Sequence, residues 1–164
     1  MPKPYFENPN PITPQGYAAL RARYDFLFQE ERPKIVETVS WAAGNGDRSE
    51  NGDYIYGKKR LREIDWELGS LSRKMKAAQV IDPAEQPDKD RVWFGATVTI
   101  ADEQDNQRTL TLIGDDEADA GQGRVGWNSP FARALRGASV GDLRRVKLPA
   151  GEVEYEVLAI RYPA

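Results

Sequence analysis

The sequence predicts a two-domain α+β protein, with an N-terminal antiparallel coiled-coil hairpin over residues 1–81 and a C-terminal β-sheet domain over residues 92–164. In the first half, apolar residues recur at steps of three and four, as on one face of a helix. In the second half, short runs rich in β-branched residues alternate with turn residues, which is typical of strands. Residues 82–91 carry two prolines and four acidic residues, and this composition predicts an extended linker.

The first helix is expected to follow Thr13, which can serve as the N-cap with Pro14 at the first helical position. An apolar stripe then continues in steps of three and four. Its positions are Tyr17, Leu20, Tyr24, Leu27 or Phe28, Ile35, Val39 and Ala42. Pro33 interrupts the pattern, and because an interior proline costs about 3 kcal/mol, a kink or a local break is expected there.

The second helix carries a heptad seam over about three heptads. Its positions are Tyr54, Gly57, Leu61, Ile64, Leu68, Leu71, Met75 and Ala78. Because only a few residues separate the two periodic segments, they are expected to fold back on each other as an antiparallel coiled coil.

The C-terminal half predicts one sheet and one short helix. The expected strands form two hairpins, the first from residues 92–100 and 109–113, the second from residues 143–148 and 153–160. Between the hairpins, Ser129 and Pro130 predict the N-cap and first residue of a helix that ends before Gly137. Four aromatic residues are expected in the small core of this domain: Trp93, Phe94, Trp127 and Phe131.

The composition excludes several classes of chemistry. The 164 residues include neither cysteine nor histidine, which excludes disulfides, thiolate zinc sites and serine–histidine triads. Any metal site must therefore use oxygen ligands, which suit Mg²⁺ or Mn²⁺. The net charge of −3 is uneven, since residues 1–81 carry 13 basic and 11 acidic residues and residues 82–164 carry 10 and 15. With no transmembrane segment or signal peptide evident, we expect a cytoplasmic protein.

Two acids lie at the expected tip of the hairpin. Asp47 and Glu50 are three residues apart, so at the start of a helix their carboxylates can share one side. The same spacing suits a capping box with Asp47 as the N-cap and Glu50 at the third helical position, a purely structural role. Against that role, a cap needs no long stalk. Because Mg²⁺ takes six oxygen ligands, two carboxylates that bind it would have to share it with a partner's site.

A basic run, Lys58-Lys-Arg-Leu-Arg62, follows the tip. A solvated helix face is one interpretation, because acids follow at Glu63, Asp65 and Glu67. The other is that Lys58, Lys59 and Arg62 contact nucleic-acid phosphates, with Arg48 joining them. We expect these cations on more than one face of the helix, so that only part of the run follows one RNA strand.

The aromatic residues of the hairpin suggest different roles. Tyr54 lies on the seam and is expected in the core. Tyr56 lies off the seam and could stack on a base or on a neighbouring helix. Trp41 and Trp66 are expected to pack at the helix interface.

The chain resembles the Gre family of bacterial transcript-cleavage factors, closest to its GreB branch, and the resemblance covers nearly the whole sequence. It is carried by GDRSEN at 46–51 followed by Asp53-Tyr54, and by YGKKRLREID at 56–65. Further matching segments are 12–17, 30–33, 41–43, 129–130, 140–142 and 149–151. The resemblance implies a coiled-coil hairpin and an FKBP-like C-terminal domain.

The resemblance also implies a function. In this family the C-terminal domain docks at the rim of the RNA polymerase secondary channel, and the hairpin passes down the channel to the active centre. Asp47 and Glu50 match the two catalytic acids, which help hold a Mg²⁺ shared with the polymerase while the polymerase cleaves backtracked 3′ RNA. The chain would then have no cofactor of its own. Its expected partners are the polymerase and the nascent RNA 3′ end, with no membrane, and we expect a monomer.

Further site residues follow from the tip and from the resemblance. Contacts to RNA at or near the tip are expected from Arg48, Asn51, Tyr54, Lys58, Lys59 and Arg62. Docking to the polymerase is expected from Asn128, Ser129 and Pro130. Asn128 departs from the family pattern, which has an acid before the Ser-Pro pair. Gly52 stands where alanine is usual, and Gly57 is a second weak point, since a helical glycine costs up to about 1 kcal/mol.

Two other functions remain open for this architecture. A channel-binding regulator could occupy the pore without promoting cleavage, although a simple plug would not need the acids Asp47 and Glu50. The FKBP-like domain could instead act as a prolyl isomerase. The spacing of residues 82–164 shows no obvious aromatic pocket for proline, and we expect no such activity.

Overall fold

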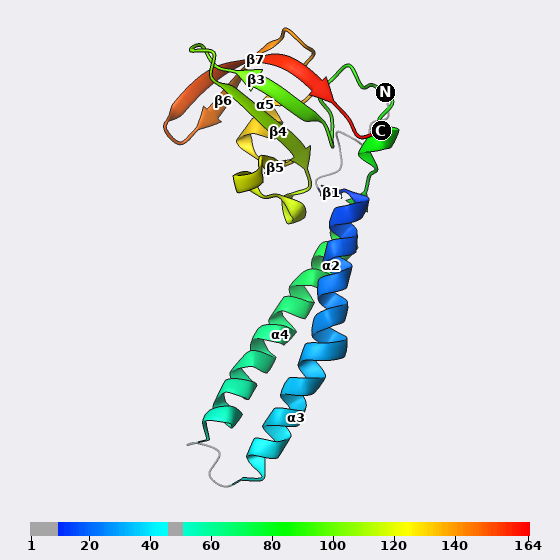
Figure 1. The fold of residues 1–164 in the computed structure, drawn as a ribbon, viewed down its shortest axis with the longest axis vertical. Helices are drawn as coiled ribbons and strands as arrows, with labels where there is room; N and C mark the ends of the chain where they lie inside the picture. Colours follow the sequence, from blue (N-terminus) through cyan, green and yellow to red (C-terminus); the bar gives the residue numbers. More distant parts are fainter. Residues whose placement is uncertain (1–9, 46–50) are drawn as a thin grey trace. The chain divides into compact units, whose positions relative to one another are not determined.

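The computed structural model describes residues 10–45 and 51–164, and it divides the chain into two compact units (Figure 1). The helical unit is Ala18–Ala77, and the sheet unit joins Met1–Tyr17 to Ala78–Ala164. This division differs from the predicted boundaries, because the residues that lead into the first helix group with the sheet and not with the hairpin. Within the described residues, no helix has both the length and the apolar character needed to cross a membrane.

The helical unit is an antiparallel pair of helices. Its first arm consists of α2 (Pro14–Phe26), the π-helical turn η1 (Leu27–Glu31) and α3 (Arg32–Ala43), and its second arm is α4 (Gly52–Ala77). Seven of the eight predicted seam positions lie in the second arm and are buried or half-buried, which confirms the heptad pattern, whereas the eighth, Ala78, lies just beyond the end of α4. On the first arm the seam uses Leu27, which is fully buried, while Phe28 is 55% exposed.

The α-helical hydrogen bonding of the first arm is interrupted just before Pro33, which agrees with the expected local break, and the interruption is a π-helical turn with α-helix on both sides. The N–H of Arg32 donates to the carbonyl of Leu27, five residues back, in the π-helical turn just before the proline. Proline has no N–H, and its ring crowds the carbonyl four residues back in a regular α-helix. A π-helical turn shifts the hydrogen bonds by one residue and inserts an extra position, which accommodates Pro33.

The sheet unit contains a five-stranded sheet in the order β5-β4-β3-β7-β6. Its strands are β3 (Thr97–Ala101), β4 (Gln107–Ile113), β5 (Arg124–Gly126), β6 (Leu143–Leu148) and β7 (Gly151–Arg161). The two predicted hairpins are confirmed, since β3 pairs antiparallel with β4 and β6 pairs antiparallel with β7. The third antiparallel pair, β3 with β7, joins the hairpins into one sheet.

Short elements complete the sheet unit. The helix α5 (Pro130–Leu135) begins as predicted, with the Ser129 hydroxyl accepting from the Ala132 N–H at 3.4 Å, and Gly137 follows its end with φ +76°. A two-stranded parallel pair joins β1 (Pro11–Ile12) to β2 (Gln79–Val80). The 3-10 turns are η2 (Pro83–Glu85), η3 (Asp115–Glu117) and η4 (Ala120–Gln122).

The core of the sheet unit includes three of the four predicted aromatic residues as buried side chains. Trp93, Phe94 and Trp127 are buried, whereas Phe131 is half-buried and packs against the core. Phe94 and Trp127 meet edge to face with ring centroids 5.9 Å apart. α5 adds Ala132 and Leu135 to this core.

The prediction of an extended linker over residues 82–91 is wrong. Pro83 and Gln86 are buried within the sheet unit. A Cβ at Gly95 would lie closer than 3.0 Å to the Pro83 ring, so this proline packs directly on the backbone of the sheet unit. The proline ring is apolar and can be buried. Here the packing of Pro83 in the sheet unit keeps the segment from being an extended linker, although its composition is typical of one.

Candidate functional site

The segment that carries the predicted catalytic acids joins the two arms of the helical unit. Asp47, Arg48 and Glu50 lie outside the described residues. On one side the first arm ends at Ala43, and on the other the second arm begins at Gly52. The two acids therefore belong to the connection between antiparallel helices, at one end of the helical unit.

Asn51 caps the second arm of the hairpin. Its Oδ1 accepts a hydrogen bond from the N–H of Tyr54 at 3.2 Å, the N-cap interaction, and its Nδ2 donates to the carbonyl of Ala42 at 2.9 Å. Because Asn51 occupies the N-cap of α4, the alternative in which Asp47 caps this helix with Glu50 at its third position is wrong. The side chain of Asn51, predicted to contact RNA, is engaged within the hairpin.

Gly57 permits a close approach of the two arms. It is buried, and a Cβ at this position would lie closer than 3.0 Å to Cγ2 of Val39. Glycine has a low helix propensity, but at this position its missing side chain makes room for the facing helix. Tyr54, one turn earlier, is half-buried on the same seam, as predicted.

Ion pairs between the arms engage the acids of α4. Arg23 binds Glu67 with hydrogen bonds of 2.7 and 3.2 Å, and Arg32 binds Asp65 with bonds of 2.8 and 3.4 Å. The hydrogen bond from Arg23 lowers the pKa of the Glu67 carboxyl. Both arginines come from the first arm, so these acids are paired with cations outside the basic run.

Arg60 is the member of the basic run that faces the other arm. It binds Glu31 with two hydrogen bonds of 2.6 and 3.0 Å and lies 3.8 Å from Glu63. The hydrogen bond from Arg60 is the main cause of a lowered pKa for the Glu31 carboxyl. Arg60 and Glu31 are each about 22–23% exposed, so this pair is shielded from solvent better than the other two.

Lys58, Lys59 and Arg62, here called the basic strip, remain exposed and form no ion pair with any residue the structure describes. The interpretation of a solvated helix face is correct in that the three side chains are exposed, but the pairing with Glu63, Asp65 and Glu67 that it included is not seen among the described residues. At about 100° per residue, Arg62 falls between the two lysines and all three lie within an arc of about 100°. The expectation that these cations occupy separate faces is also wrong, since they form one strip.

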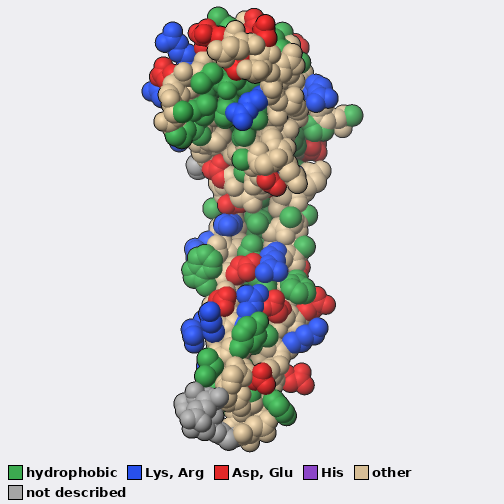
Figure 2. All heavy atoms as spheres, turned by 60° about the vertical axis from the view of Figure 1, so that its left-hand side comes forward, with side chains coloured by type: hydrophobic (Ala, Val, Ile, Leu, Met, Phe, Trp, Pro, Cys, Tyr) green, Lys and Arg blue, Asp and Glu red, His purple; other side chains and the backbone are tan. Residues whose placement is uncertain are grey.

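Exposed apolar side chains accompany the charges of the helical unit (Figure 2). Trp66 is 71% exposed and Trp41 is 63% exposed, which corrects the expectation that both pack at the helix interface. Tyr56 is 63% exposed and lies off the seam, as predicted. Exposed aromatic rings on a helix that also carries exposed cations are suited to stacking on single-stranded bases.

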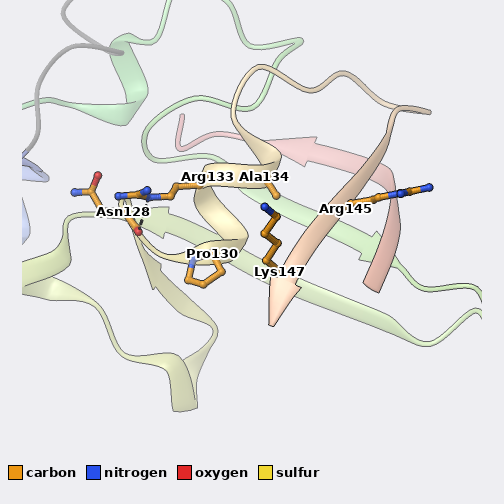
Figure 3. Close-up of a pocket in the computed structure, with 6 residues that line it drawn as sticks. All are labelled: Asn128, Pro130, Arg133, Ala134, Arg145 and Lys147. Carbon is orange, nitrogen blue, oxygen red and sulfur yellow. Dashed lines mark hydrogen bonds between the residues drawn. The ribbon is translucent and has the colours of Figure 1, made fainter. Parts of the chain in front are cut away.

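A second candidate site is a cavity of about 440 Å³ in the sheet unit, between α5 and β6 (Figure 3). The residues that line it are Asn128, Pro130, Arg133, Ala134, Arg145 and Lys147. Lys147 extends toward Ala134, whereas Arg145 extends away from α5. Three cations and no carboxylate among the lining residues make this a site for an anionic group. Two of the three predicted docking residues line it, and the third, Ser129, caps α5.

Hydrogen bonds hold the backbone and the side chain of Asn128. Its N–H and its Nδ2 donate to the carboxylate of Asp115 at 3.1 and 2.8 Å, and its carbonyl accepts from Arg133 at 3.0 Å. An acid at this position would lose the Nδ2 donor and would face the carboxylate of Asp115. The asparagine and Asp115 therefore form a matched pair.

Four residues of this region were not among the predicted site residues. They are Asp115, Arg133, Arg145 and Lys147. Arg145 and Lys147 are two residues apart on one strand, a spacing that puts both on one face and could have identified them. The partner of Asn128 had no such signal, because thirteen residues separate it from Asp115.

Comparisons with known proteins cover nearly the whole chain. The family described as "Transcription elongation factor, N-terminal" matches residues 10–80, and "Transcription elongation factor, GreA/GreB, C-term" matches residues 86–162. Transcription elongation factor GreB of Neisseria meningitidis serogroup B is 46% identical over 156 residues, 95% of this chain and 96% of that protein.

Two further proteins are similar to the chain. Transcription elongation factor GreA of a Nitratiruptor species is 41% identical over 157 residues, 95% of each chain. The crystal structure of GreA factor homolog 1 of Thermus thermophilus aligns with a TM-score of 0.42 at 19% identity, over 93% of this chain and 98% of that one. By the family matches and the sequence identities, the chain belongs to the GreA/GreB family of transcription elongation factors.

Proposed function

We propose that this protein is an accessory transcription elongation factor that stimulates RNA polymerase to cleave the 3′ RNA of its own backtracked complexes. Family membership supports the elongation role. The observation that carries the cleavage role is that Asn51, not Asp47, caps α4. The cap of α4 therefore does not require Asp47 or Glu50.

The helical unit is suited to reach a buried active centre through the secondary channel of the polymerase. α4 has 26 residues, which corresponds to a length of about 39 Å at 1.5 Å per residue. The basic strip lies within the first three turns of this helix, close in sequence to the acids. Lys58, Lys59 and Arg62 bind the phosphates of the extruded RNA, and Tyr56 offers a ring for base stacking.

Asp47 and Glu50 would hold a Mg²⁺ that the polymerase also binds. The donor set fits this ion, because two carboxylates supply hard oxygen ligands and leave positions for ligands from the polymerase. Held there together with the polymerase's own ion, Mg²⁺ would supply activation of water and charge stabilisation for the in-line displacement at phosphorus. The role of this chain is to bring the two carboxylates to the RNA and to bind the RNA beside them.

The FKBP-like sheet unit docks at the rim of the channel through the cavity between α5 and β6. Asn128 and Pro130 line this cavity together with Arg133 and Lys147, so a carboxylate on the polymerase surface is the complementary group. Ser129 acts through α5, whose first turn it caps.

The test uses halted elongation complexes that carry backtracked, 3′-labelled RNA. Complexes with Mg²⁺ are followed with and without the protein, and its binding to polymerase is measured in parallel. Mg²⁺-dependent release of a short 3′ fragment, much faster with the protein than without it, is the expected result. Binding without faster release, together with repression of initiating polymerase, would replace this proposal with that of a channel-binding regulator.

A further inference from the structure

Trp66 is a large apolar side chain that the helical unit leaves in water. It is 71% exposed, and its ring makes no contact with another ring or with a cation among the residues that the structure describes. A single exposed apolar residue is common on protein surfaces and needs no function. The role of Trp66 therefore has to be judged from the residues that lie beside it along α4.

The residues beside Trp66 on the outward face of α4 are cations. At about 100° per residue, four side chains fall within an arc of about 60° on this helix. They are Lys59, Arg62, Trp66 and Arg73, here called the outer row. The buried seam residues Ile64 and Leu68 lie on the opposite side of the helix. The three cations of the outer row are exposed and form no ion pair within the described part of the chain.

The acids of α4 lie outside the outer row. Glu63 falls about 40° beyond its edge in the helical projection. Asp65 and Glu67 accept hydrogen bonds of 2.8 and 2.7 Å from arginines of the first arm, so their charges are already engaged. A ligand that lies along the row therefore meets three positive charges and no carboxylate of the row itself, which favours an anionic ligand.

The helix surface between Trp66 and Arg73 carries almost no side-chain bulk. Gly69 and Ser70 lie one turn beyond the tryptophan. A Cβ at Gly69 would lie 3.3 Å from Nη1 of Arg73, so this guanidinium folds back over the glycine in the direction of Trp66. On the other side, Arg62 lies one turn before the tryptophan. A flat group placed on the ring thus has a cation within reach at each end.

We propose that Trp66 stacks on a base of single-stranded RNA while the cations of the outer row bind the phosphates on either side of that base. An exposed indole ring offers a stacking surface to any base, and Lys and Arg neutralise phosphates. Ring and cations alternate along one line of the helix, as bases and phosphates alternate along a strand. Stacking tolerates every sequence, so such a site suits RNA of arbitrary sequence.

The source of this RNA rests on the proposed function, in which the 3′ segment of a backtracked transcript is extruded along the hairpin from the tip acids. Trp66 lies 14 residues beyond the start of α4, which corresponds to about 21 Å. A short extruded segment ends before it reaches Trp66, whereas a long one passes over it. The site therefore favours long extruded RNA over short.

Fluorescence titration with single-stranded oligouridylate tests the stacking in the absence of polymerase. In a Trp41→Phe background Trp66 is the exposed tryptophan, because Trp93 and Trp127 are buried. A base that stacks on indole quenches its emission, so emission is expected to fall as the RNA binds, with binding followed by the anisotropy of a labelled RNA. Arg73→Ala should move both titrations to higher concentrations. Binding without quenching, or no binding at low salt, would overturn the proposal.

Substitutions of Trp66 separate stacking from other effects on RNA binding. Trp66→Ala is expected to weaken the binding of oligouridylate about fivefold or more, which corresponds to the loss of one stacked base. Trp66→Phe keeps an aromatic ring and should recover most of the affinity. The matched control is Phe28→Ala, which removes a ring that is 55% exposed on the first arm and stacks on Tyr24. Equal weakening by the control would contradict a specific site, and melting curves verify that all variants are folded.

Cleavage of backtracked complexes tests the source of the RNA. Two kinds of complex are compared, with extruded segments shorter and longer than the distance of about 21 Å from the start of α4 to Trp66. Trp66→Ala is expected to slow cleavage in the long complexes about fivefold or more and to leave the short ones unchanged. Equal slowing of both would indicate that Trp66 contacts the polymerase and would overturn the proposal. If the wild type does not stimulate cleavage, the proposed function fails, while the titration still decides the stacking.

Discussion

The side-chain amide of Asn51 donates a hydrogen bond to the carbonyl of Ala42 at 2.9 Å and so ties the end of α3 to the start of α4. The same side chain caps α4 through the N–H of Tyr54. One residue therefore closes the two helices just beside the segment that carries Asp47 and Glu50.

The two roles of Asn51 can be separated by substitution. Asn51→Asp keeps an acceptor for the cap but loses the donor to Ala42, whereas Asn51→Ala loses both. We expect Asn51→Ala to lower the free energy of unfolding by about 1–2 kcal/mol and Asn51→Asp by less, since aspartate caps as well as asparagine. Urea unfolding measures both, and equal losses would show that the donor to Ala42, which both variants lack, carries the whole effect.

The pair of Glu31 and Arg60 predicts acid sensitivity of the helical unit. The pKa of Glu31 is lowered from its usual value of 4.5 by the hydrogen bond from Arg60. Its contribution to stability is therefore present above about pH 4.5 and is lost as the pH falls through the lowered pKa. For a partly exposed pair we expect about 0.5–1 kcal/mol.

Urea unfolding at pH 7, 5, 4 and 3 tests this expectation. Glu31→Gln should be less stable than the wild type at pH 7, and the difference should shrink steadily as the pH falls toward 3. The control is Glu37→Gln, which removes an exposed acid of α3 that has no ion pair within the described part of the chain. A pH-independent difference for Glu31→Gln would contradict the ion-pair explanation.

Gly57→Ala is expected to destabilise the hairpin although alanine is the better helix former. Propensity alone would stabilise the helix by about 1 kcal/mol. The added methyl group meets Val39, and overpacking of this kind typically costs about 1–3 kcal/mol. Combining Gly57→Ala with Val39→Ala removes the collision, and the melting temperature of the double variant should lie above that of Gly57→Ala alone. If Gly57→Ala alone raised the melting temperature, the two arms would have to move apart near Gly57 at little cost, which would contradict the close-packing explanation.

The basic strip predicts salt-dependent binding of RNA. Replacing Lys58, Lys59 and Arg62 with alanine is expected to weaken cleavage of long backtracked RNA. It should also reduce the slope of log affinity against log salt by about 0.7 for each phosphate that is no longer neutralised. Lys74→Ala with Lys76→Ala, two exposed lysines at the far end of α4, is the matched control. If the variants of the basic strip and of the control lysines had equal salt slopes, the strip would be a solvated helix face that does not bind RNA.

Periodicity made most of the fold predictable, and the failures have physical causes. The seam of α4 follows from apolar residues spaced three and four apart. The two hairpins of the sheet follow from strand patterns that alternate every second residue. The pairing of β1 with β2 could not be foreseen, because each strand has two residues and their partners are distant in sequence. Pro83 was misjudged because proline was treated only as a breaker, whereas here it is buried in the sheet unit. The break expected at Pro33 takes the form of a π-helical turn, a form that the sequence pattern did not specify.

The candidate site was predictable where it is local in sequence. The tip motif and the basic run are contiguous, so residue types and spacing sufficed to single them out. Which acid pairs with which arginine depends on how the two arms align, and sequence alone did not specify that Glu67 meets Arg23 or that Asp65 meets Arg32. The hydrogen bond from the N–H of Thr13 to the carboxylate of Glu117 was not predictable for the same reason, since 104 residues separate the two.

We propose that Asp47 and Glu50 act in cleavage and not in folding or docking. The decisive measurement is the rate of RNA cleavage in backtracked complexes at saturating protein, for Asp47→Asn combined with Glu50→Gln. The control is Asp53→Asn, an exposed acid in the first turn of α4. We predict that the double variant binds polymerase as the wild type does and cleaves about a hundredfold more slowly, while the control cleaves normally. A double variant that binds and cleaves at the wild-type rate would contradict the account.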